Sequence, residues 1–150
     1  LTISLSLCFT PAFKALEGEH DENISIARMK ELVGESLTEY LQKTSISIYN
    51  KARKIAESKG IILADTKFEF GKHNDDILII DELLTPDSSR YWPVEGYKPG
   101  ESPPSYDKQI VRDYLEKSGW DKHPPIPSLP EEIIQKASEK YGEIKDILTN

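Results

Sequence analysis

The stretch GIILADTKFEFGKHNDDILIIDELLTPDSSRYW, residues 60–92, decides the fold. Short aliphatic runs begin at Ile61 and at Ile77, and such runs are typical of buried strands. Turn-forming residues fill positions 74–76 between them, which predicts an antiparallel hairpin built from the two runs. A polar loop is expected after the second run, over residues 85–90. We therefore expect the chain to be organised around a small antiparallel sheet.

The first predicted strand carries charge on one face. Side chains alternate along a strand, so Asp65, Lys67 and Glu69 share one face and the other face is apolar. With residues 74–76 as the loop, the simplest register places Glu69 opposite Asp81. Two carboxylates directly across a ladder repel each other unless a cation lies between them.

A Mg²⁺ ion would relieve this repulsion. Mg²⁺ prefers hard oxygen ligands and takes only one or two carboxylates when nucleotide phosphates complete its coordination shell. The pair of Glu69 and Asp81 therefore predicts a site for Mg²⁺ and a nucleotide, where Lys67 reaches a phosphate or a substrate carboxylate as a point charge. The alternative is a pair of solvated acids on the wet face of a hairpin.

The composition limits the function classes. The chain has 150 residues, a net charge of −7 and an isoelectric point near 5.0, which argues against a nucleic-acid-binding surface because such a surface needs a basic patch. No apolar run is long enough to cross a membrane. The single cysteine, Cys8, rules out an internal disulfide and fits a reducing compartment. We expect a cytoplasmic protein of one domain.

The first residues are expected to form a strand and then a loop. Residues 1–9 read LTISLSLCF, and alternation of aliphatic with hydroxyl-bearing residues predicts a strand. This segment lacks an initiating methionine and a basic region, so we do not expect a signal peptide. Residues 9–25 contain Pro11, Gly18 and a polar cluster, which predicts a loop.

Apolar residues recur with helical spacing in four segments, and each segment is expected to form an amphipathic helix. The expected helices cover residues 26–34, 36–59, 108–117 and 131–148. Ser36 followed by Glu39 is a capping-box pattern, which predicts that the second helix starts there, and Gly60 is expected to end it. Segments rich in proline, over residues 97–107 and 120–130, are expected to be connectors.

The TPDSSR segment, residues 85–90, combines a rigid turn with groups that can bind anions or polar ligands. Asp87, Ser88 and Ser89 offer acceptors and hydroxyl groups, while Arg90 offers a planar fork for phosphate or carboxylate. The alternative is a capped turn with a surface arginine.

Two cations lie four residues apart on the helix expected over residues 108–117. Lys108 and Arg112 share one face of that helix and repel each other unless an anion lies near them. A phosphate or dicarboxylate substrate would supply this anion. Asp107 and Asp113 could neutralise the pair instead.

Four segments in order resemble one enzyme family. ADTKFEFG at residues 64–71 and IDELLTPDSSRYWP at residues 80–93 resemble the signature pair of the phosphoribosylaminoimidazole-succinocarboxamide synthase (SAICAR synthetase) family. FTPAFKALEGEHDENIS at residues 9–25 and SYDKQIVRDYL at residues 105–115 extend the resemblance. It implies an α+β fold, SAICAR synthase-like or ATP-grasp-like, in which an antiparallel hairpin sheet packs with helices.

The resemblance also implies a division of the chain. The chain corresponds to the family's C-terminal ATP- and substrate-binding region, and an N-terminal lobe precedes this region in the family. Its expected parts are a strand and active-site loop (1–25), helices (26–59), a catalytic hairpin and loop (60–93), and a C-terminal loop with helices (94–150).

The implied activity is that of an ATP-dependent ligase of purine biosynthesis. Such an enzyme joins L-aspartate to carboxyaminoimidazole ribotide through an acyl phosphate and releases SAICAR, ADP and phosphate. The implied cofactors are ATP and Mg²⁺, and the implied partners are small molecules rather than nucleic acid or membrane. Two alternatives stay open: a truncated, non-catalytic remnant of that enzyme, and another phosphotransferase that uses Mg²⁺ and a nucleotide.

The resemblance assigns roles to individual residues. The implied catalytic residues are Lys67, Glu69 and Asp81, of which Glu69 and Asp81 hold Mg²⁺. The implied ATP contacts are Lys14, Asp65, Glu69 and Asp81. The implied substrate contacts are Lys14, Asp87, Ser89, Arg90, Lys108, Gln109 and Arg112, with Glu19, His20, Asp21 and Glu22 lining the same cleft. The chain departs from the family at Phe13, where the family usually has threonine.

Overall fold

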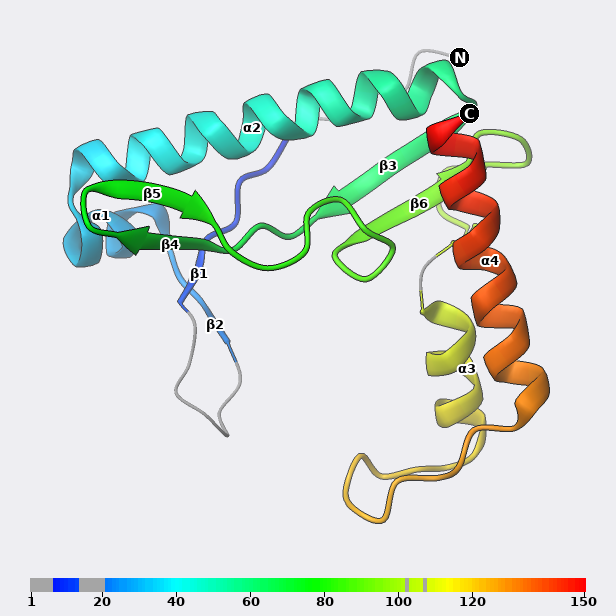
Figure 1. Cartoon of the computed structure of the whole chain (residues 1–150). Coiled ribbons are helices and arrows are strands. Elements are labelled where there is room, and N and C mark those ends of the chain that lie inside the picture. Colours follow the sequence, from blue (N-terminus) through cyan, green and yellow to red (C-terminus); the bar gives the residue numbers. More distant parts are fainter. Residues whose placement is uncertain (1–6, 14–20, 102, 107) are drawn as a thin grey trace. The chain divides into compact units, whose positions relative to one another are not determined.

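The computed structural model describes residues 7–13, 21–101, 103–106 and 108–150 (Figure 1). Within these ranges the chain forms four helices and six strands, and every strand pair is antiparallel. The expected α+β class is therefore confirmed. The chain divides into two compact units, Leu1–Asn50 and Lys51–Asn150, and the boundary falls inside helix α2.

The first unit contains a minimal strand pair followed by a helix. Strands β1 (Ala12–Phe13) and β2 (Glu22–Asn23) pair across the segment expected to be a loop. Helix α1 (Ile26–Val33) begins after Ser25, whose Oγ accepts a hydrogen bond from the backbone N–H of Arg28 at 3.0 Å. The strand expected over residues 1–9 falls mostly outside the described residues, and residues 7–10 form none.

Helix α2 (Glu35–Ser58) starts one residue earlier than the capping-box pattern predicts. Ser36 therefore lies inside the helix, and the predicted capping box is wrong. The backbone oxygen of Gly34 instead accepts hydrogen bonds from the N–H of Thr38 at 3.1 Å and from its Oγ1 at 2.8 Å. At the other end Gly60 has a φ of 72°, which a glycine adopts without a Cβ clash, so it ends the helix as expected.

The core of the second unit is a two-stranded sheet that the sequence did not predict. Strand β3 (Ile61–Thr66) pairs with β6 (Ser89–Pro93), so that Leu63 lies opposite Tyr91. The predicted pairing of the first aliphatic run with the run at Ile77 is therefore wrong, and part of the predicted polar loop is a strand. The buried hydrophobic residues of this sheet are Ile61, Ile62, Leu63 and Tyr91.

The run at Ile77 belongs to a separate hairpin. Strands β4 (Phe70–His73) and β5 (Asp76–Ile79) pair with His73 opposite Asp76. The turn is one residue shorter than predicted because Asn74, at a φ of 55°, accepts the left-handed conformation that a tight turn needs.

The shorter turn shifts the whole ladder by one residue. The N–H of Ile80 donates to the backbone oxygen of Glu69 at 2.9 Å, so Glu69 lies opposite Ile80. The predicted register, with Glu69 opposite Asp81, is wrong. Gly71 lets the Ile80 side chain approach the hairpin closely, since a Cβ at position 71 would lie 3.0 Å from Ile80 Cδ1.

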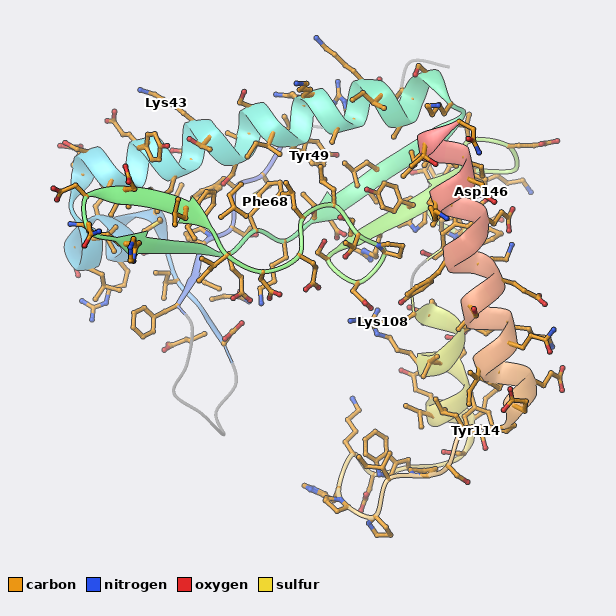
Figure 2. All side chains as sticks on the ribbon, viewed as in Figure 1. Lys43, Tyr49, Phe68, Lys108, Tyr114 and Asp146 are labelled. Atoms are coloured by element: carbon orange, nitrogen blue, oxygen red, sulfur yellow. The ribbon has the colours of Figure 1, made fainter. Side chains whose placement is uncertain are left out.

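The last two helices lie side by side and match the predicted ranges within one residue. Helix α3 covers Gln109–Lys117 and helix α4 covers Glu131–Thr149. On α3, Tyr114 (labelled in Figure 2) donates from its hydroxyl to the backbone oxygen of Ser128 in the connector at 3.4 Å. No helix within the described ranges is both long and apolar enough to span a membrane.

Tyr106 links α4 to the β3–β6 sheet. Its N–H donates to the backbone oxygen of Tyr91 in β6 at 3.1 Å, and its hydroxyl donates to Glu143 Oε1 on α4 at 3.2 Å. The ammonium of Lys140 lies 5.1 Å from the centre of the Tyr106 ring, and Ile144 is buried on the same helix. Tyr106 thus connects helix α4 with strand β6 of the sheet.

We predict that Leu63→Ala lowers the free energy of unfolding by about 2–5 kcal/mol, because Leu63 is fully buried and its truncation leaves a cavity. Urea denaturation of the purified chain measures this change. The matched control is Leu83→Ala, since Leu83 is 41% exposed. Equal losses in the two variants would contradict the assignment of the β3–β6 sheet as the core.

Candidate functional site

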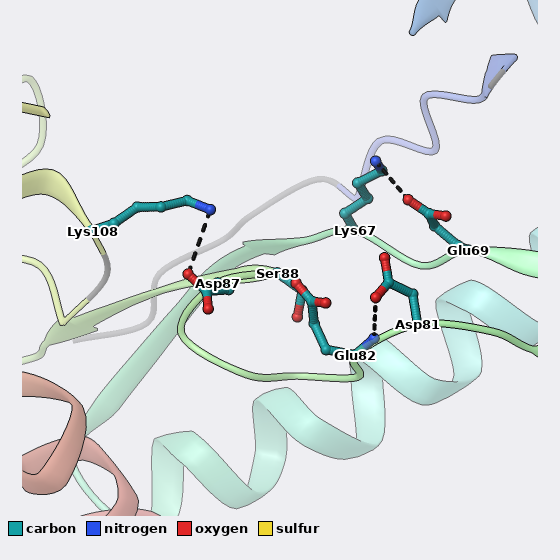
Figure 3. Close-up of a pocket in the computed structure, with 7 residues that line it drawn as sticks. All are labelled: Lys67, Glu69, Asp81, Glu82, Asp87, Ser88 and Lys108. Carbon is teal, nitrogen blue, oxygen red and sulfur yellow. Dashed lines mark hydrogen bonds and ion pairs between the residues drawn. The ribbon is translucent and has the colours of Figure 1, made fainter. Parts of the chain in front are cut away.

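A charged hollow of about 190 Å³ lies in the second unit (Figure 3). Its lining combines four carboxylates with two ammonium groups and one hydroxyl. The residues are Lys67, Glu69, Asp81, Glu82, Asp87, Ser88 and Lys108. The hollow therefore contains five of the residues that the sequence analysis predicts for the site.

The segment between β3 and β4 supplies Lys67 and Glu69. The N–H of Lys67 donates to the backbone oxygen of Ser88 at 2.8 Å, which ties this segment to the loop before β6. Lys67 Nζ lies 2.9 Å from Glu69 Oε1, and the Glu69 side chain is only 15% exposed. The partly buried carboxylate of Glu69 is thus held beside a cation.

Asp81 reaches the hollow because the backbone leaves the strand conformation there. Consecutive residues of a regular strand point to opposite faces, so the neighbours Ile80 and Asp81 would diverge. Asp81 instead has a φ of 90°, which is rare for a residue with a side chain. The turn brings its carboxylate into the same hollow as Glu69, although the two residues are not directly opposed. Such strained positions cluster at functional sites.

The loop that follows Asp81 is fixed by side-chain hydrogen bonds. The buried hydroxyl of Tyr91 donates to the backbone oxygen of Leu84 at 2.7 Å, and burial raises the pKa of this hydroxyl, which keeps it a donor. The N–H of Thr85 donates to Ser88 Oγ at 3.1 Å. These bonds hold the loop in one conformation.

The acidic residues of this loop repel one another. A hydrogen bond shared with the Asp81 side chain raises the pKa of Glu82, and the charges of Asp81 and Asp87 raise it further. Bringing carboxylates together in this way costs stability in the absence of a cation. The cluster is therefore suited to a bound cation.

Two donors converge on Asp87. Lys108, which immediately precedes α3, places Nζ 3.4 Å from Asp87 Oδ1. Tyr141 on α4 donates from its hydroxyl to the same oxygen at 3.0 Å. Asp87 therefore connects the hollow to the C-terminal helices.

The donor set fits Mg²⁺ that shares its shell with phosphate. Glu69, Asp81 and Glu82 offer hard carboxylate oxygens, which Mg²⁺ prefers. Among the described residues no group of three His, Cys, Asp or Glu is arranged to hold a metal ion alone. A hollow of about 190 Å³ has room for an ion and a phosphate group but is smaller than ordinary small-molecule pockets.

Asp65 and Arg90 lie outside this lining and pair with each other. Arg90 Nε lies 3.0 Å from Asp65 Oδ1 and 2.9 Å from Oδ2, and Nη2 also contacts Oδ2. The Arg90 guanidinium lies 5.7 Å from the centre of the Trp92 ring. Ser89 is buried and donates to Thr66 Oγ1 at 2.8 Å. Alternation along β6 therefore places Ser89 and Arg90 on opposite faces of the strand.

The remaining predicted residues are distributed over other elements. Gln109 and Arg112 lie on α3 and do not line the hollow; Gln109 Nε2 donates to Asp113 Oδ1 at 2.7 Å. Asp21 and Glu22 are exposed in the first unit. Lys14, Glu19 and His20 lie outside the described residues.

Sequence reasoning missed two participants and left one unassigned. Glu82 follows Asp81 directly, so the adjacent acidic pair was the available signal. Ser88 was recognised as a polar group of the TPDSSR segment but was given no role. Tyr141 lies on the helix expected over residues 131–148, and no local pattern connects it with Asp87.

The comparisons with known proteins agree on one family. The model of the SAICAR synthetase family matches residues 5–127. A phosphoribosylaminoimidazole-succinocarboxamide synthase of Geobacter sulfurreducens is 57% identical over 135 residues, which cover 90% of this chain and 46% of the relative. A namesake of Thermodesulfovibrio yellowstonii is 55% identical over 142 residues, which cover 95% of this chain and 48% of the relative. The chain thus spans about half the length of these relatives.

Solved structures give the same result. A SAICAR synthase of Saccharomyces cerevisiae complexed with SAICAR has a TM-score of 0.75 and 44% identity, and the match covers 85% of this chain and 43% of that one. A SAICAR synthetase in complex with ADP has a TM-score of 0.61 and 27% identity, and the match covers 87% of this chain and 46% of that one.

We predict that Asp81→Gly is more stable than Asp81→Ala by about 1 kcal/mol, because only glycine adopts a φ of 90° without a steric penalty. Urea denaturation of the two variants measures the difference. At Asp76, an exposed strand residue, alanine is expected to be the more stable replacement. If alanine were the more stable replacement at Asp81 as well as at Asp76, Asp81 would not be strained.

We predict that Glu82→Gln stabilises the chain more at neutral pH than at about pH 4. The pKa of Glu82 is raised above its ordinary value of 4.5, so the folded state binds this proton more tightly than the unfolded chain. The protonated Glu82 carboxyl group therefore contributes stability that is fully present below its pKa in the unfolded chain. This contribution is lost as the pH rises through its pKa in the folded state. Thermal unfolding of both proteins across this range gives the difference. A difference that is constant with pH would contradict the like-charge cluster.

Proposed function

This chain belongs to the SAICAR synthetase family, and on that premise we propose that it carries the Mg²⁺- and phosphate-binding site of an ATP-dependent ligase of purine biosynthesis. The ligase joins L-aspartate to carboxyaminoimidazole ribotide and releases SAICAR, ADP and phosphate in the cytoplasm. The observation that carries the proposal is the hollow that combines acidic residues with Lys67 and Lys108.

The proposed reaction needs a site of mixed charge. A carboxylate is a poor electrophile, so the ribotide carboxylate first attacks the γ-phosphorus of ATP. The bond to the bridging oxygen breaks, ADP leaves, and the carboxylate becomes an acyl phosphate. The amine of aspartate then attacks the acyl carbon, and phosphate leaves. Phosphoryl transfer is catalysed mainly by positioning and by neutralisation of charge. Charged groups that the fold gathers in one hollow can meet both requirements.

The acidic side of the hollow is proposed to hold the metal. Glu69 and Asp81 would bind Mg²⁺, which neutralises phosphate charge when it is bound. Lys67 lies 2.9 Å from Glu69, and 58% of its side chain is exposed, so it can reach a phosphate while Glu69 turns to the metal. The same three residues are the proposed catalytic group.

The other side is proposed to hold the ribotide and aspartate. Lys108 offers an ammonium for a carboxylate or phosphate, and Asp87 offers an acceptor for an N–H group. Further contacts proposed from the family resemblance are made by Lys14, Ser89, Arg90, Gln109 and Arg112, and an ATP contact by Asp65. At Arg90 a ribotide phosphate would have to compete with the Asp65 carboxylate for the guanidinium.

The test is ADP release by the chain with Mg·ATP, carboxyaminoimidazole ribotide and aspartate, with aspartate omitted as the control. Release that requires aspartate supports the ligase. Release that is independent of aspartate would contradict it and would indicate another phosphotransferase. Calorimetric binding of Mg·ADP by the same sample reports the nucleotide site separately from turnover.

We predict that Glu69→Gln lowers ADP release by about 100-fold or more, because the variant loses a charged metal ligand and the partner of Lys67. Its fold is expected to persist, with an unchanged far-UV circular dichroism spectrum. The matched control is Glu101→Gln, which alters an exposed acid paired with Lys98 and outside the hollow. Near-normal turnover in Glu69→Gln would sink the metal assignment.

A further inference from the structure

Tyr141 connects the C-terminal helix with the hollow. It lies on α4, beyond residues 5–127 that match the family model. Its hydroxyl nevertheless donates to Oδ1 of Asp87 at 3.0 Å, across 54 positions of sequence. Because Asp87 lines the hollow, a residue outside the matched region is one hydrogen bond away from the site.

The two donors to Asp87 fix one oxygen and leave the other for a ligand. Tyr141 and Lys108 both contact Oδ1, and hydrogen bonds to a charged acceptor are stronger than neutral ones. Among the described residues, no hydrogen bond or ion pair of Asp87 involves Oδ2. An ionised carboxylate oxygen only accepts hydrogen bonds, so Oδ2 can accept one from an N–H or O–H group of a ligand.

Helix α4 does not depend on Tyr141 for its attachment. Tyr106 contacts both Glu143 and Lys140 on this helix, and Ile144 is almost completely buried. These contacts remain when the Tyr141 hydroxyl is removed. The hydroxyl is therefore separable from the docking of the helix, and its loss can be tested without unfolding the chain.

We propose that Tyr141 is a positioning residue of this site. Its hydroxyl holds the Asp87 carboxylate so that Oδ2 accepts an N–H group of the substrate, while Lys108 stays beside the hollow for an anionic group. The identity of the ligand rests on the proposed function: SAICAR carries amine and amide N–H groups together with carboxylates. Tyr141 itself touches no reacting atom and acts through Asp87.

The test is calorimetric binding of SAICAR, in the presence of Mg·ADP, by the chain and its variants. Tyr141→Phe is expected to weaken binding by about 3- to 10-fold, the equivalent of one hydrogen bond. The matched control is Tyr114→Phe, because the Tyr114 hydroxyl contacts the backbone of Ser128 rather than the hollow. This control is expected to bind as tightly as the unmodified chain.

A double-mutant cycle separates positioning from general packing. If Tyr141 acts through Asp87, Tyr141→Phe has no further effect on SAICAR affinity in the Asp87→Asn background. The same loss in both backgrounds would overturn the proposal, as would unchanged affinity in Tyr141→Phe alone. A purely structural role would lower the unfolding midpoint and leave the affinity unchanged.

A second measurement needs no ligand. The acylation rate of Lys108 by an amine-reactive reagent, mapped by mass spectrometry, reports how firmly Asp87 holds the ammonium. Tyr141→Phe is expected to raise the acylation rate of Lys108 toward the rate in Asp87→Asn. The acylation rate of Lys117, at the end of α3, is expected to stay unchanged. If the unmodified chain does not bind SAICAR, the proposed function is contradicted. The acylation rate of Lys108 then tests the role of Tyr141 by itself. An unchanged rate at Lys108 overturns the proposal.

Discussion

The backbone turn at Asp81 is the constraint on which the acidic side of the site depends. The β4–β5 ladder places Glu69 opposite Ile80, and continued strand geometry would send Asp81 to the other face. A φ of 90° redirects it, so that the carboxylates that precede β4 and follow β5, those of Glu69 and Asp81, line one hollow. The loop that carries this strained residue is held by the Tyr91 hydroxyl and by the link between Lys67 and Ser88. Buried packing of the β3–β6 sheet thus supports an unfavourable local conformation.

The charges of the hollow indicate a use for the strained conformation of Asp81. Four carboxylates and two ammonium groups leave an excess of negative charge. The pKa of Glu82 is raised, first by a hydrogen bond shared with the Asp81 side chain and then by the charges of Asp81 and Asp87. A divalent cation relieves the repulsion and at the same time creates affinity for phosphate. The lysines lie at the two sides of the hollow, paired with Glu69 and with Asp87. This arrangement suits a metal-bound anion better than a bare cation or a bare anion.

Local patterns in the sequence predicted the helices and most of the hollow. The helical spacing predicted all four helices. Lys67, Glu69 and Asp81 do line one hollow, although the register from which the sequence placed Glu69 beside Asp81 is wrong. The β6 strand was missed because the turn-forming TPDSS segment leads directly into it, and only tertiary pairing with β3 reveals it. The register was missed by one residue because Asn74 permits a tighter turn than assumed. The contact of Tyr141 with Asp87 spans 54 positions and has no local signature.

The most direct measurement of the central claim is a calorimetric titration of the chain with ADP, first with Mg²⁺ and then with the metal removed by a chelator. The account predicts tighter binding with Mg²⁺, because the carboxylates around Glu69 and Asp81 repel a bare phosphate and attract a metal-bound one. Equal or tighter binding of ADP without the metal would contradict it. Lys67 and Lys108 alone would then account for the affinity, and the acidic residues would have no part in binding the nucleotide.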